Sequence, residues 1–228
     1  MNETMTKIAL FCEGVSENRM LTYITQRYLG EDVIVDGIYP SVTENHGRMT
    51  QDDFGGWKAV LDHCNEKDID SALDGHDYLI IQIDTDTCNE VHYDVKTTDE
   101  NGIRLSDDLI YDKVTERLLK DISEEKKKEY SGKIIFAICF NETECWLLPP
   151  YYEKDKKKCE KTNSCIYTLN KALSTQGMGI PEKAKNTPGA IKVYDKILKG
   201  FKPKNIPQYA QYNLGFKKFV EQLDGITV

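Results

Sequence analysis

The fold is decided by two stretches, KIALFCEGVSE at residues 7–17 and LIIQIDTD at residues 79–86. Each begins with a continuous apolar run of the length of a buried strand and ends in carboxylates. The first run leads into Glu13, and the second leads into Asp84 and Asp86. Ligands of open parallel sheets bind outside the carboxyl ends of the strands, so the three acids meet at one edge if these strands are neighbours. They would repel one another there unless a cation lay between them, and Mg²⁺ prefers oxygen ligands of this kind.

The rest of the chain alternates between strand-like and helix-like segments. We predict further strands at 33–39 and 134–140, and helices at 16–29, 57–64, 106–119, 142–148, 189–198 and 214–223, with loops at 41–53, 87–105 and 176–189. Ser16 is expected to cap the first helix, and Gly30 to end it. This alternation predicts an α/β fold with a mostly parallel, Rossmann-like sheet flanked by helices. We expect a core at 1–150 and a basic, mainly helical extension at 151–228 packed on it.

The Glu-Gly and Asp-x-Asp endings of the two apolar runs resemble a Toprim domain, the metal-binding fold of topoisomerases, bacterial primases and OLD-family nucleases. The form at residues 13–17, EGVSE, is closest to the nuclease branch, where a second Glu often follows the first. Residues 134–148, IIFAICFNETECWLL, are similar to the RloB-like small Toprim proteins of restriction and phage-defence loci. A weaker similarity lies at residues 216–220.

This resemblance implies a metal-dependent nuclease that cleaves phosphodiester bonds in DNA or RNA. It implies that Glu13, Asp84 and Asp86 hold Mg²⁺ or Mn²⁺, and that Glu13 is either a ligand or a general acid/base. Asp84 and Asp86 would point to the same side of an extended backbone. Gly14 would let the chain turn sharply beside the metal. The resemblance also implies an effector of anti-phage defence that works with a separately encoded ATPase. This chain has no GxxxxGK[ST] phosphate loop, so any ATP hydrolysis would have to come from that partner.

Two further acids are candidates for the same site. Glu17 follows the first strand on the first turn of a helix, where it is either a catalytic or metal-binding residue or a favourable charge at the helix N-terminus. Glu144 lies four residues past the strand at 134–140, which brings it to the same sheet edge. Its alternative is a surface residue beside a helix-capping Asn141.

The charge of the chain is unevenly distributed. The net charge is −8, but residues 181–228 carry nine lysines against four acids. A basic flank beside an acidic metal centre suits a phosphodiester substrate, because lysines neutralise backbone phosphates. Lys185 and Lys192 are the candidate nucleic-acid-binding residues. The alternative is that these lysines only solvate helix faces.

Composition limits where such a protein works. The seven cysteines are scattered and form no CxxC pair, which favours reduced thiols over a zinc site. No apolar run approaches the roughly 18 residues of a membrane helix, and the first residues lack the pattern of a signal peptide. We therefore expect a cytoplasmic protein with no membrane partner, and a homo-oligomer is compatible with the sequence.

Two other functions compete with a nuclease. Residues 84–87, DTDT, follow an apolar strand and resemble the Asp-x-Asp-x-Thr motif of haloacid dehalogenase-type phosphatases. That family also needs a later acidic pair at a strand end, which this sequence does not offer. The other alternative is a non-catalytic module that uses a Toprim-like surface to dock an ATPase or another protein.

Overall fold

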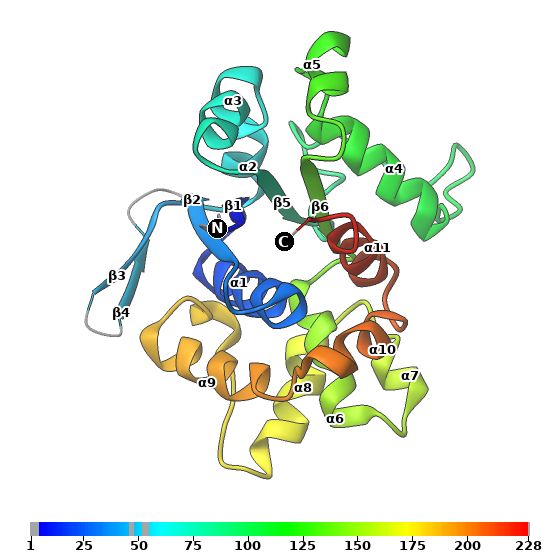
Figure 1. The fold of residues 1–228 in the computed structure, drawn as a ribbon. Helices are drawn as coiled ribbons and strands as arrows, with labels where there is room; N and C mark the ends of the chain where they lie inside the picture. The colour runs from blue at the N-terminus through cyan, green and yellow to red at the C-terminus, as the bar shows by residue number, and fades with distance from the viewer. Residues whose placement is uncertain (1–4, 46–47, 52–54, 228) are drawn as a thin grey trace.

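The computed structural model of the chain describes residues 5–45, 48–51 and 55–227. A four-stranded parallel sheet stands in the middle of the molecule, with helices on both faces (Figure 1). Its strands are β1 (Lys7–Phe11), β2 (Ile34–Tyr39), β5 (Tyr78–Asp84) and β6 (Ile134–Cys139), in the spatial order β2-β1-β5-β6. The predicted α/β class with a parallel, Rossmann-like sheet is confirmed.

The register of the central pair brings the two carboxylate-ended strands side by side. In the parallel pairing of β1 with β5, Ile8 lies opposite Tyr78 and Phe11 opposite Ile81. The residues after Phe11 therefore run beside the end of β5, which is Asp84. This adjacency is what the two apolar runs predicted.

Both faces of the sheet are buried, which explains why its strands read as continuous apolar runs. Successive residues of β1 point to opposite faces: Ile8 and Leu10 belong to one buried cluster, whereas Ala9 and Phe11 belong to another. The cluster that contains Ile8 packs under α1 (Val15–Leu29), α8 (Cys165–Ser174), α9 (Pro188–Leu198), α10 (Ile206–Ala210) and α11 (Leu214–Leu223). The other packs under α2 (Trp57–His63), α3 (Glu66–Gly75) and α4 (Asp107–Leu118). The C-terminal helices thus share one core with the sheet.

Helix α11 protects the open edge of β6. The Gln222 amide pairs with the backbone of Phe136 as a neighbouring strand would: its Oε1 accepts from Phe136 N at 2.9 Å, and its Nε2 donates to Phe136 O at 3.1 Å. The helix approaches closely because Gly215 has no side chain, since a Cβ there would lie 1.9 Å from Ile138 O. Trp146 stacks on Phe216 of the same helix, with ring centroids 4.7 Å apart, and so holds the helix against the core.

Several predicted boundaries change. The expected loop at 41–53 contains a hairpin of β3 (Val42–Asn45) and β4 (Arg48–Gln51), and residues 46–47 and 52–53 lie outside the described residues. Helices α3 and α5 (Glu124–Glu129) were not expected. The predicted helix at 142–148 is a 3₁₀ turn, η1 (Thr143–Leu147), followed by the short helices α6 (Pro149–Tyr152) and α7 (Lys156–Cys159). Two further 3₁₀ turns, η2 (Glu182–Ala184) and η3 (Pro203–Asn205), flank α9. Loop 87–105 and the ends of α4, α9 and α11 follow the prediction within two residues.

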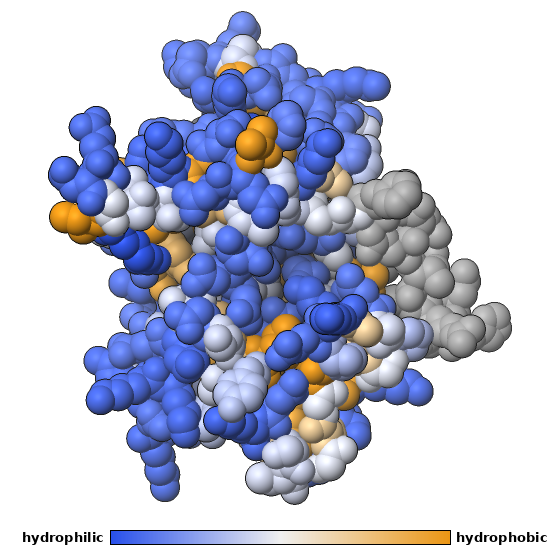
Figure 2. Space-filling model, turned by 180° about the vertical axis from the view of Figure 1, so that it is seen from behind, coloured by the Kyte–Doolittle hydropathy of each residue, from blue (hydrophilic) through white to orange (hydrophobic). Residues whose placement is uncertain are grey.

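The surface is mostly polar. Figure 2 shows the back of the molecule, where hydrophilic residues cover most of the face and the apolar areas are small. Among the side chains that the structure describes, the exposed large apolar ones are Met5, Val91, Ile103, Leu109 and Tyr167. Within the described ranges, no helix is long and apolar enough to cross a membrane.

Candidate functional site: a buried acidic cluster at the strand ends

Glu13 and Asp84 meet at the carboxyl ends of the two central strands. The backbone N–H of Asp84 donates to Glu13 Oε1 at 2.7 Å, and the backbone N–H of Glu13 donates to Gln82 Oε1 at 3.0 Å. These cross-strand bonds fix Glu13 beside the end of β5. The strand ends at Asp84, so Asp86 lies in the following turn and not on an extended backbone. The expectation that Asp84 and Asp86 share one strand face is therefore wrong, because the turn re-aims Asp86.

Asp84 is held by two side chains that sequence analysis did not single out. Its Oδ1 accepts from the Thr143 hydroxyl at 2.5 Å and from Gln82 Nε2 at 3.0 Å. Gln82 Nε2 also lies 3.1 Å from the Thr143 hydroxyl. Asp84 is only 6% exposed. One oxygen is thus anchored, and the carboxylate is oriented for a ligand at the other.

A pocket of about 430 Å³ opens over this edge of the sheet. Its lining is dominated by acids and includes Asp84, Asp86, Glu142, Glu144, Glu182 and Lys185, with Ser164, Ile166 and Tyr167 on the α8 side. Asp84 and Glu144 are buried and Asp86 is exposed. The structure thus brings Asp84, Asp86 and Glu144 together around one pocket, as the strand ends predicted, and it adds Lys185 to the same lining.

Glu144 and Glu17 are both inside the protein. Glu144 is fully buried, which excludes the surface position that we weighed for it, and Tyr194 donates to its Oε1 at 2.6 Å. Glu17 is 2% exposed in the first turn of α1. Lys185 Nζ bridges the two acids, at 2.7 Å from Glu17 Oε1 and 3.3 Å from Glu144 Oε1. Burial of a carboxylate is costly unless it is paired, so the lysine is part of what makes this arrangement stable.

Burial raises the pKa values of Glu13, Asp84 and Glu144, in a cluster that holds more carboxylates than positive charges. Burial raises the pKa of Glu13 to about 8, the N–H of Asp84 offsets part of this, and the charges of Glu17 and Asp86 add to it. Burial and the charge of Glu13 raise the pKa of Asp84 well above its ordinary range. Burial also raises the pKa of Glu144, although Lys185 opposes the shift. One ammonium therefore does not neutralise the acids around it.

Gly14 leaves room for this packing. Its φ of −171° is extended, so the expected sharp turn is not the reason for a glycine. A Cβ would instead lie 3.0 Å from Glu17 Oε2 and 3.1 Å from Asn186 Nδ2. Gly14 is also the N-cap of α1, so Ser16 does not cap the helix as predicted. The Ser16 hydroxyl lies 2.8 Å from Glu17 Oε2 and 3.0 Å from Asn186 Oδ1.

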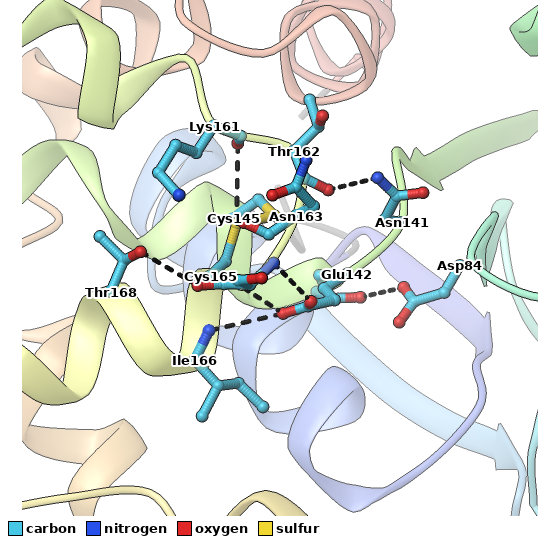
Figure 3. The surroundings of a disulfide bond; sticks show 12 residues. Asp84, Asn141, Glu142, Cys145, Lys161, Thr162, Asn163, Cys165, Ile166 and Thr168 are labelled. Carbon is cyan, nitrogen blue, oxygen red and sulfur yellow. Dashed lines mark hydrogen bonds between the residues drawn. A yellow bond between two sulfur atoms is a disulfide. The ribbon is translucent and has the colours of Figure 1, made fainter.

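Glu142 lines the other wall of the pocket, and a disulfide lies beside it (Figure 3). The Glu142 carboxylate accepts the backbone N–H groups of Ser164 at 3.0 Å and of Cys165 at 3.1 Å, where α8 begins. Cys145 and Cys165 form a disulfide with their Cα atoms 5.0 Å apart. The expectation of reduced thiols is wrong for this pair, because η1 and the start of α8 lie side by side. The other five cysteines are free and buried.

The predicted basic residues have different positions. Lys185 is engaged with buried acids, whereas Lys192 is exposed on α9 and forms no ion pair with any described residue. Tyr167 stands at the pocket with 57% of its surface exposed, and Lys171 Nζ lies 4.3 Å from its ring centroid. No sequence signal distinguished Tyr167 from other helix-surface residues.

The oxygen ligands of the strand-end acids fit a hard cation, although their carboxylate oxygens do not all lie within 4.8 Å of one another. Glu13, Asp84 and Asp86 offer carboxylate oxygens, which Mg²⁺ and Mn²⁺ prefer. Among the described residues, the one trio of candidate ligand side chains whose ligand atoms lie within 4.8 Å of one another is Glu142 with Cys145 and Cys165. Its two sulfurs are joined in the disulfide, so that trio is not a metal site. The fit of the strand-end acids rests instead on their oxygen ligands and on the raised pKa values of Glu13 and Asp84, which Lys185 does not fully offset.

Comparison with known proteins finds no match among family models, curated proteins or solved structures.

Proposed function

We propose that this protein is a metal-dependent nuclease whose active centre is the acidic cluster at the ends of β1 and β5. The observation that carries the proposal is the Glu13–Asp84 contact, in which two acids with raised pKa values share one edge of a parallel sheet. Such carboxylates are tolerated in a fold when a cation is their partner. The resemblance of these strand endings to a Toprim domain supports the same function.

Glu13, Asp84 and Asp86 would hold Mg²⁺ or Mn²⁺. When bound, the ion would polarise a phosphoryl oxygen and lower the pKa of a water molecule. Asp84 is oriented for this by Thr143 and Gln82. Glu13 carries its proton with a pKa of about 8 before a cation arrives, so it can exchange a proton near neutral pH.

The surroundings of the pocket suit a nucleic acid. The exposed ring of Tyr167 offers a face on which an unpaired base can stack, and Lys171 beside it offers a charge for a phosphate. Exposed lysines follow on the neighbouring C-terminal segment, at positions 183, 192, 196, 199, 202 and 204. Lysines at such positions attract the phosphate backbone. We propose that Lys192 is one of the lysines that contact the phosphate backbone. We also propose that the nuclease acts in anti-phage defence together with a separately encoded ATPase.

The motif that suggested a phosphatase is incomplete in this chain. The fifth position of Asp-x-Asp-x-Thr is Cys88 in this chain, so the similarity ends at Thr87. Cys88 is fully buried and cannot supply the missing hydroxyl.

The experiment that tests the proposal is cleavage of a mixed panel of plasmid, single-stranded DNA, transfer RNA and messenger RNA. Wild type, Glu13→Ala and Asp84→Ala are each assayed with Mg²⁺, with Mn²⁺ and with a chelator. We expect cleavage that requires the metal and is lost in both variants. Cleavage that persists in either variant would contradict the proposed centre. Metal-dependent cleavage that needs an added ATPase would support a partner-activated nuclease, whereas none in either setting would favour a docking module.

A further inference from the structure

The ammonium of Lys185 lies inside the acidic cluster. Its Nζ contacts Glu17 Oε1 at 2.7 Å and Glu144 Oε1 at 3.3 Å, and the lysine side chain is 29% exposed. The two acids reach it from different elements, Glu17 from α1 and Glu144 from η1. Neither is one of the three strand-end acids proposed to hold the metal. The cluster therefore divides into the three strand-end acids and a buried pair, Glu17 and Glu144, that already has a cation.

The buried pair has the features of a cation site. Glu17 and Glu144 are 2% and 0% exposed, so bulk water does not solvate the charge of either carboxylate. Glu144 Oε2 is buried and has no hydrogen-bond partner, while its Oε1 receives both Tyr194 and Lys185. An unpartnered carboxylate oxygen at this depth is a free ligand position. Two acids with one free oxygen would hold a divalent ion if the lysine were absent.

We propose that the Lys185 ammonium occupies the position of a second cation, so that the protein binds one divalent ion per chain and not two. This inference rests on the proposed nuclease function. Two-metal centres use one cation on the attacking oxygen and one on the leaving oxygen of a phosphoryl group. A lysine provides a fixed point charge with three N–H donors. One of them donates to Glu17, the charge also pairs with Glu144, and the remaining N–H groups face the pocket that Lys185 lines, where a phosphate oxygen can accept from them.

The test is the number of Mn²⁺ ions bound by the metal-free protein, measured by equilibrium dialysis with metal analysis. Wild type is expected to bind one ion per chain. Lys185→Met removes the ammonium and is expected to bind two, because Glu17 and Glu144 become available. Lys185→Arg keeps a cation between the acids and is expected to bind one. Circular dichroism with and without Mn²⁺ shows that each variant is folded during the titration.

The outcomes separate this inference from the proposed function. Two ions on the wild type would overturn the inference and leave the nuclease proposal intact. One ion on both wild type and Lys185→Met would overturn it as well, because the ammonium would then not be excluding a cation. No ion on the wild type would remove the metal centre and both proposals with it. If Lys185→Met does not fold without metal, it is refolded with Mn²⁺ and its bound ions are counted, where two ions are expected and a single ion would overturn the inference.

Discussion

The raised pKa of Glu13 makes the stability of the metal-free protein depend on pH. Below about pH 4.5, Glu13 is protonated in the folded and the unfolded chain alike. Between pH 4.5 and about 8, the folded protein keeps a proton that the unfolded chain has released. The unfolded state then binds fewer protons, so the free energy of unfolding falls as pH rises through this window.

The size of the effect follows from the two pKa values. The difference between about 8 in the folded protein and 4.5 in the unfolded chain is worth, at about 1.36 kcal/mol per pH unit, a ceiling of about 5 kcal/mol. Because Asp84 shares the same burial and repulsion, its ionisation acts in the same direction. A loss of about 2–5 kcal/mol is a large fraction of the stability of a typical domain.

The assay is urea unfolding at pH 5, 6.5 and 8 in the presence of a chelator, for wild type and Glu13→Gln. We expect the wild-type free energy of unfolding to fall across this range and the variant to show a shallower slope. Saturating Mg²⁺ at pH 8 should restore wild-type stability and not that of the variant. A wild-type stability that is flat or rises from pH 5 to 8, or that matches Glu13→Gln throughout, would refute the burial argument.

Three other perturbations have defined outcomes. Gly215→Ala should lower the free energy of unfolding by at least about 3 kcal/mol in urea, because its Cβ would lie 1.9 Å from a backbone oxygen. The control is Gly189→Ala, whose Cβ has nothing within 4 Å and which should change the free energy of unfolding by no more than about 1 kcal/mol. Equal effects of the two substitutions would contradict the close approach of α11 to β6. Tyr167→Ala should weaken binding of single-stranded oligonucleotides by about 1–3 kcal/mol in fluorescence anisotropy with Ca²⁺ in place of Mg²⁺, and unchanged affinity would remove the stacking role. Replacing Cys145 and Cys165 by Ser should cost about 2–4 kcal/mol, since the bridge closes a loop between residues 20 apart; a free-thiol titration that finds all seven cysteines reduced in the native protein would contradict the disulfide.

The centre of the fold was predictable because it depends on local pattern. Buried parallel strands read as continuous apolar runs, so β1, β5 and β6 could be placed from their own residues. The adjacency of Glu13 and Asp84 then followed from a general property of open sheets, that the carboxyl ends of parallel strands share one edge. Glu144 reached this edge for the same reason, because it follows the end of β6 in the turn η1.

What could not be predicted depends on contacts between distant segments. Lys185 lies 168 residues from Glu17, and no local pattern distinguishes it from the other lysines of the C-terminal segment. Gln82 is a buried residue inside β5, and no local pattern indicates that its side chain bonds to the Asp84 carboxylate and to the backbone N–H of Glu13. Helix α3 was missed because it contributes only Ile69 and Ala72 to the core, which is too few apolar positions for a periodic signal.

The most direct test of the central claim is the cleavage rate of Asp84→Asn on whichever nucleic acid wild type cuts. Asparagine keeps the shape and one acceptor oxygen but removes the charge that a metal requires. The matched control is Asp77→Asn, just before the other end of β5, where the side chain accepts from Lys7 N. The account predicts a loss of at least about 100-fold for Asp84→Asn and a rate near wild type for Asp77→Asn. Asp84→Asn that cuts as fast as its control would contradict the account.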